Sequence, residues 1–158
     1  MEKHYNDSAR AGLLNRLLGV RVDRAAAALP GGTSGAIFTI SNGVVLMTAI
    51  LGEWVGAASG ACNLKITANP TLATAVDTDL CAVAAVATCD IGSLLSIDGT
   101  PANALLAPHV GAVELQTPTG IFLQEGTLDL DASTTITGNV KWSIWYIPAE
   151  EGAIVTAA

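Results

Sequence analysis

Charged, aromatic and sulfur-containing side chains are scarce in this chain. Of its 158 residues 13% are charged and 4% are aromatic, and histidine occurs only at positions 4 and 109. Cysteine occurs three times, at Cys62, Cys81 and Cys89, without a CxxC pair and far from either histidine, so a typical zinc site is not expected. The odd number predicts free, buried thiols, with a Cys81–Cys89 disulfide as the alternative.

A long apolar run is also missing. A membrane-spanning helix needs about 18 or more uninterrupted apolar residues, and the richest stretch, GVVLMTAILGEWVGAASGA, is broken by Glu53 and by glycines. The start of the chain lacks the pattern of a secretory signal peptide. We therefore expect no membrane partner. Half of the residues are nevertheless apolar, which predicts surfaces that contact other proteins.

No recognisable catalytic motif is present. His109 has no GxSxG-type serine elbow to accompany it, and the segment GGTSG lacks the lysine of a phosphate-binding loop. The acid pairs Asp77/Asp79 and Asp129/Asp131 have the spacing of calcium ligands or of a glycosidase pair, but no glycine-punctuated acidic loop surrounds them. We expect no catalytic residues, no cofactor and no metal, and we interpret the acids as solvated surface groups.

Positive charge is concentrated at the N-terminus. Five of the seven basic residues lie in the first 24 positions, which carry a net charge of +2, whereas the remaining residues carry −9. Asp7 or Ser8 is a suitable N-cap for a short helix with a leucine stripe, and the segment AAAALPGG ends this region. Residues 1–32 are therefore predicted to be a basic arm or anchor. Its anchoring residues are predicted to be Arg10, Leu13, Leu14, Arg16, Leu17, Leu18, Arg21 and Arg24. A nucleic-acid partner is not expected, because Tyr5 is the only stacking aromatic there.

Strand and turn signals dominate the rest of the chain. Asn42-Gly43 lies between two β-prone runs and predicts a tight hairpin turn. Similar signals recur about every 8–12 residues, which is the spacing of an all-β sandwich or barrel. We predict that residues 33–158 form an antiparallel, jelly-roll-like β-sandwich.

The closing segment, GNVKWSIWYIPAEEGAIVTAA, holds three of the seven aromatic residues. Strand alternation places Trp142 and Tyr146 on one face and Trp145 on the other. A strand that is apolar on both faces is either central in a sandwich or covered outside by a partner. Trp142, Trp145 and Tyr146 are thus predicted to be core or inter-subunit aromatics, with the small C-terminal residues lying along a neighbouring subunit.

The chain resembles a group of small structural proteins of tailed bacteriophages. Three segments carry the resemblance, in this order along the chain: VDRAAAALPGGTSGAIFTISNGVVLMTAILGEW, CNLKITANP and the closing segment. The resemblance covers roughly residues 20–158. It implies a head-decorating (cement) or fibre-type protein built on a β-sandwich, with no catalytic residues to transfer.

Together these patterns predict a non-enzymatic structural protein of a phage virion. We expect a capsid decoration protein, made in the bacterial cytoplasm and placed on the capsid surface, that binds the major capsid protein and its own copies as a homotrimer or another symmetric cluster. The alternative is a carbohydrate-binding module of a fibre or tail that uses Trp54 or Trp145. A third hypothesis is a hydrolase that uses Asp129 and Asp131.

Overall fold

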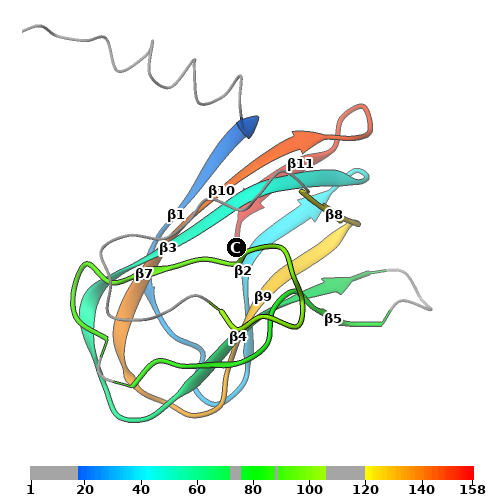
Figure 1. Ribbon diagram of the computed structural model, residues 1–158. Coiled ribbons are helices and arrows are strands. Elements are labelled where there is room, and N and C mark those ends of the chain that lie inside the picture. The colour runs from blue at the N-terminus through cyan, green and yellow to red at the C-terminus, as the bar shows by residue number, and fades with distance from the viewer. Residues whose placement is uncertain (1–17, 72–75, 88, 106–119) are drawn as a thin grey trace, which may run out of the picture.

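The computed structural model describes residues 18–71, 76–87, 89–105 and 120–158. Every element in these ranges is a β-strand, and every pairing between the strands is antiparallel. The strands form two sheets packed face to face (Figure 1). The predicted all-β sandwich is confirmed.

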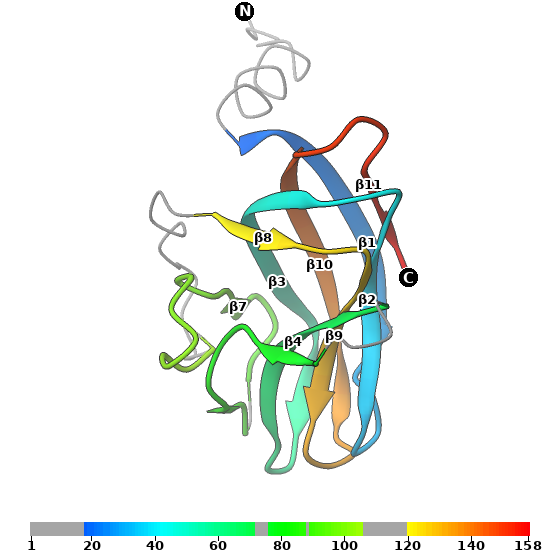
Figure 2. The same cartoon turned by 90° about the vertical axis from the view of Figure 1, so that its right-hand side faces the viewer.

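Sheet A contains β1 (Val20–Ala28), β10 (Thr137–Pro148), β3 (Val45–Ser59) and β7 (Leu94–Leu95) in that order, and β8 (Ile121–Leu123) also pairs with β3. Sheet B contains β11 (Ile154–Ala157), β2 (Ser34–Ser41), β9 (Gly126–Ala132), β4 (Asn63–Pro70) and β5 (Thr78–Asp79), and β6 (Ala84–Ala85) also pairs with β4. Figure 2 shows β1 and β11 on one side of the sandwich and β8 on the other.

The core lies between the two sheets and is filled by alternate residues of each strand. Trp54 and Trp142 are its largest fully buried side chains. Glycines make room for both indoles, because a Cβ on Gly52 would lie 2.7 Å from the Trp142 ring and one on Gly138 would lie 2.5 Å from the Trp54 ring. Each indole therefore needs a neighbouring strand position without a side chain.

The structure corrects two predictions, one on the extent of the arm and one on a hairpin. Residues 20–28, which the sequence analysis assigned to the arm, form β1 and pair with β10, so they belong to the sandwich. The strands on either side of Asn42-Gly43 do not form the predicted hairpin. Asn42 and Gly43 do have positive φ angles, of 61° and 124°. The chain nevertheless passes there from sheet B to sheet A, because both flanking strands find other partners.

The C-terminal segment also differs from its prediction. Instead of leaving the body to lie along a neighbour, Ile154–Ala157 form β11 and pair with β2 of the same chain. Ala153 and Val155 are buried in the core. The small residues at this end therefore complete sheet B.

Candidate interaction surfaces

The outer face of sheet A carries a charged cluster over one tryptophan. The Arg21 guanidinium lies 5.1 Å from the centre of the Trp145 ring, which leaves Trp145 9% exposed. Arg21 also donates hydrogen bonds to Asp23 (2.8 Å) and to the Ser143 hydroxyl (3.2 Å), and Ser143 donates to Asp23 (2.6 Å). Partial burial acts to raise the pKa of Asp23, but the hydrogen bonds from Ser143 and Arg21, together with the charge of Arg21, lower it overall.

The aromatic residues of β10 are thus covered within one chain. Trp142 and Tyr146 pack in the core, which is one of the two places predicted for them. Trp145 faces outward, as strand alternation predicted, but Arg21 of the same chain covers it. Trp54 is fully buried, so it cannot present a ring to a sugar, and the stacking role suggested for Trp54 is wrong.

The predicted arm residues divide into two groups. Arg10, Leu13, Leu14, Arg16 and Leu17 lie outside the described residues. Leu18 is half-buried, and its carbonyl accepts a hydrogen bond from the Thr48 hydroxyl. Arg21 is held by the cluster above, and Arg24 donates to the Ala158 carbonyl at 3.0 Å. Arg24 also lines a cavity of about 190 Å³ next to Trp142, where β1 of sheet A and β11 of sheet B lie close together.

A row of apolar side chains crosses the end of sheet A at which β1 begins. Ile147 of β10 is paired with Leu46 of β3, and Leu46 with Phe122 of β8, so the three side chains lie on one face. Ile147 is 42% exposed and Phe122 is 68% exposed. The start of the described chain adjoins this row, since a Cβ on Gly19 would touch the Ile147 side chain. We call Ile147, Leu46 and Phe122 the apolar row.

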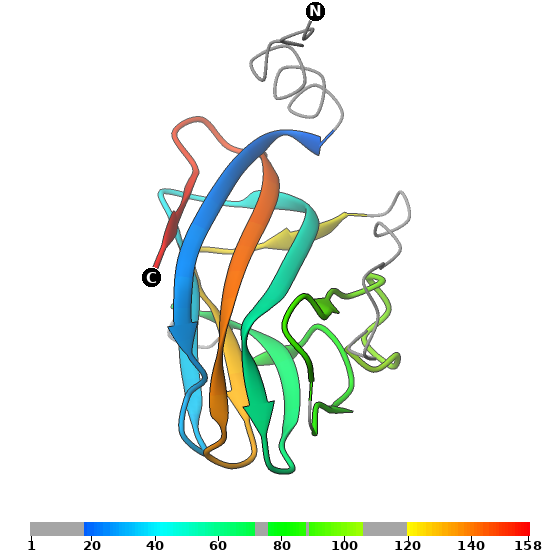
Figure 3. The same cartoon turned by 90° about the vertical axis from the view of Figure 1, so that its left-hand side faces the viewer.

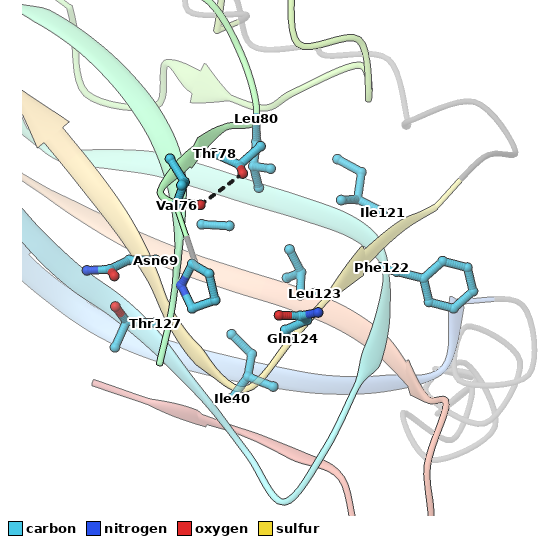
Figure 4. A pocket seen from close by; sticks show the side chains of 12 residues that line it. Ile40, Asn69, Val76, Thr78, Leu80, Ile121, Phe122, Leu123, Gln124 and Thr127 are labelled. Carbon is cyan, nitrogen blue, oxygen red and sulfur yellow. Dashed lines mark hydrogen bonds between the residues drawn. The ribbon is translucent and has the colours of Figure 1, made fainter. Parts of the chain in front are cut away.

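Beside this row a cleft of about 370 Å³ opens between the two sheets (Figure 4). Ile40, Leu80 and Leu123 supply buried apolar atoms to its lining, and Asn69 and Gln124 supply amide groups. Figure 4 shows the ring of Phe122 pointing away from the other lining side chains. The sequence analysis did not select Phe122. The pattern around this residue predicts a strand, but it does not predict which side chains of the strand stay exposed.

The acids singled out from the sequence lie on the outer face of sheet B. Asp131 accepts a hydrogen bond from Thr67 at 2.8 Å, and Lys65 bridges Asp131 (3.7 Å) and Asp79 (2.7 Å). The hydrogen bond from Lys65 is the main reason that the pKa of Asp79 is lowered. Asp77 and Asp79 are exposed, as predicted for solvated acids, and Asp131 is half-buried.

The prediction of a solvated surface acid is wrong for Asp129, which its neighbours bury. It is only 7% exposed, and its Oδ2 accepts hydrogen bonds from Ser34 (3.2 Å) and Asn69 (3.4 Å). Its Oδ1 has no partner. Neither the cleft nor the smaller cavity is lined by Asp129 or Asp131. Within the described ranges, no group of three or more His, Cys, Asp or Glu side chains is placed to hold a metal ion.

Cys62, Cys81 and Cys89 are buried thiols, as predicted, and the alternative Cys81–Cys89 disulfide does not form. His109 lies outside the described residues. In the parts of the chain that are described, no helix is long and apolar enough to cross a membrane. Comparison of the chain with protein-family models, with curated proteins and with solved structures finds no match.

Proposed function

We propose that this chain is a non-enzymatic structural protein of a bacteriophage virion. In this proposal it is a decoration protein that binds the major capsid protein on the outside of the shell as a symmetric oligomer. The observation that carries the proposal is the apolar row at the end of sheet A. Its two outer members, Ile147 and Phe122, are large side chains left exposed on the two strands that flank β3, each in register with Leu46. Such exposed apolar patches mark protein contacts.

The position of the row next to the start of the described chain supports a shell-binding end. The chain enters β1 at Gly19 and Val20, beside Ile147. The arm contributes Lys3, Arg10 and Arg16, whereas the body carries most of the acids. A basic arm suits an acidic shell, and an acidic outer body keeps decorated particles apart.

The proposal includes a jelly-roll topology for the sandwich. The strand order β1-β10-β3-β8 in one sheet and β2-β9-β4-β5 in the other supports it, with β11 added beside β2. Eight strands that alternate between two sheets in this way describe the double Greek key of jelly rolls, which are frequent in virion and lectin domains. This support is an analogy at the level of the fold, and the function itself rests on the surface.

The proposal is tested by adding the purified full chain to capsids of a phage from which this protein has been deleted. Saturable co-sedimentation is expected, with binding at least tenfold weaker for the Phe122→Asp/Ile147→Asp variant. Ile91→Asp is the matched control, because Ile91 is an equally exposed apolar residue (67%) outside the row. No binding by the wild-type chain, or equal binding by all three, would contradict the proposal.

The second candidate, a glycan-binding module, keeps one specific observation in its favour. Phe122 is 68% exposed, and its ring points outward from the cleft (Figure 4). It therefore presents to solvent an aromatic face of the kind on which sugars stack. A glycan array with wild-type protein and Phe122→Ala separates the two: saturable sugar binding that Phe122→Ala abolishes favours the module.

A further inference from the structure

The first half of β1 leaves its outer backbone edge without a partner among the described strands. β1 pairs with β10 alone, and Figure 3 shows β1 at the margin of sheet A, with β10 and β3 following in order. Unpaired edges of this kind are templates for another strand. The segment Val20–Arg24 contains neither proline nor lysine, two common protective residues, and the irregularity in β1 lies beyond it, between Arg24 and Ala27.

The direction of the β1 backbone groups follows from contacts of β10. The Thr48 hydroxyl donates to the Trp145 carbonyl, so that carbonyl points toward β3. A Cβ on Gly19 would lie 2.1 Å from the Tyr146 carbonyl oxygen, so that carbonyl points toward β1. Backbone groups alternate in direction along a strand, and the residues of β10 that face β1 therefore include Tyr146 and Ile144.

The partners of Tyr146 and Ile144 in β1 are Val20 and Val22, which consequently bond to β10. The residues between and after them, Arg21 and Asp23, direct their N–H and C=O groups to the free edge. Their side chains lie on the outer face of sheet A, where Trp145 and Ser143 hold them. The free edge thus offers backbone groups at the two positions that carry opposite charges.

We propose that this edge is an interface between two copies of the chain, in which β1 pairs antiparallel with the partner's β1 around Val22. In this register Arg21 lies opposite Asp23 of the partner subunit, and Asp23 lies opposite Arg21 of the partner subunit. Both are hydrogen-bonded positions, so the sheet continues across a two-fold axis. A two-fold contact requires a self-complementary surface, and directly opposed charges of opposite sign stabilise cross-strand pairs.

The charge pattern also selects the antiparallel arrangement. A parallel pairing in the same register would place Arg21 beside Arg21 of the partner subunit, and like charges at directly opposed positions repel. The inference rests on the symmetric oligomer of the proposed function and specifies that it contains β1-paired dimers.

Mass measurement across a concentration series tests the pairing. Light scattering of the full chain is expected to give an even number of 16.0 kDa chains. Asp23→Arg places like charges opposite each other and is expected to weaken dimerisation at least tenfold. The double variant Arg21→Asp/Asp23→Arg restores opposite charges and is expected to return to within about threefold of wild type. Asp90→Arg, the same charge reversal at an exposed position beside β7 on the other margin of sheet A, is expected to leave assembly unchanged.

A second measurement does not depend on any variant. Amide exchange of Arg21 and Asp23, followed by NMR, is expected to slow as the protein concentration rises, whereas Val22 is protected by β10 at every concentration. Equal exchange of the three amides at all concentrations would overturn the pairing. A trimer, or assembly unaffected by Asp23→Arg, would overturn the pairing while leaving capsid binding intact, because co-sedimentation reports on that separately.

Discussion

The contact between Gly52 and Trp142 gives the most direct test of how the core is built. Gly52 of β3 is paired with Trp142 of β10, and the six-membered ring of the indole lies over the glycine. A Cβ at position 52 would meet three ring carbons of Trp142 at 2.7, 2.9 and 3.0 Å. The preferred separation of two carbon atoms is about 3.5–4.0 Å. Gly52→Ala therefore requires the indole to move by about 0.5–1 Å in a packed interior.

The magnitude follows from two opposing effects. Replacing a strand glycine by alanine stabilises by about 0.5–1 kcal/mol when there is space, since glycine loses more backbone freedom on folding. Overpacking a closed core costs about 1–3 kcal/mol. Trp142 is 1% exposed and has no free volume to move into on the solvent side. We expect Gly52→Ala to lower the free energy of unfolding by about 0.5–2 kcal/mol, or about 2–6 °C in melting temperature.

Urea denaturation followed by far-UV circular dichroism measures this change, and a double-mutant cycle identifies its cause. Trp142→Phe removes the outer ring that the new methyl group of Gly52→Ala would contact. Trp142→Phe should therefore cost less stability in the Gly52→Ala background than in the wild type, by about 0.5 kcal/mol or more. Gly92→Ala serves as control. Gly92 has a φ of 89° and no atom within 4 Å of a Cβ, so its loss of stability comes from backbone strain and Trp142→Phe should not relieve it.

A Gly52→Ala variant as stable as the wild type at an unchanged denaturant slope would show that the indole does not resist the added methyl group. Simple additivity of the two substitutions would show that Gly52 and Trp142 are not coupled, because independent sites are additive.

Three further outcomes are expected. Arg21→Ala should expose Trp145, shift tryptophan emission to longer wavelength and lower stability by about 0.5–1 kcal/mol, read from fluorescence and urea melts. Because Lys65 lowers the pKa of Asp79, the pair stabilises the fold above the ordinary carboxyl pKa of about 3.9 and loses this effect as pH falls through the lower folded value. Asp79→Asn should therefore reduce stability by under about 1 kcal/mol at pH 7 and by progressively less toward pH 2, whereas a pH-independent difference would contradict the pairing. Burial raises the pKa of the Cys81 thiol, so a thiol reagent should label Cys81 only slowly in the native protein and rapidly in urea; rapid native labelling would show that the site opens.

The all-β class was readable from the sequence because it depends on local chemistry. Alternating apolar residues in segments such as Leu64–Ile66, with turn residues between them, favour extended backbone wherever the strands end up. The buried thiols were predicted from the odd number of cysteines. Strand alternation alone predicted that Trp142 and Tyr146 share one face of β10, but not that this face is the one buried in the core.

The pairing of the strands was not readable, and the errors of the sequence analysis arise there. Asn42-Gly43 has the positive φ angles of a tight turn, but whether the flanking strands pair with each other depends on contacts far along the chain. β2 and β3 pair instead with β9 and β10, about 80 to 100 residues later. The alanine-rich β1 was assigned to the arm for the same reason, since only β10 makes it a strand.

Residue type and short-range spacing are enough to predict the strand-forming segments, the uneven charge and the buried thiols. The folded chain was needed to show that Arg21 covers Trp145, that Ile147, Leu46 and Phe122 lie in one row, and that the outer edge of β1 has no partner among the described strands. Each of these features joins residues that are distant in the chain, and their proximity is set by sheet register, which no local pattern specifies.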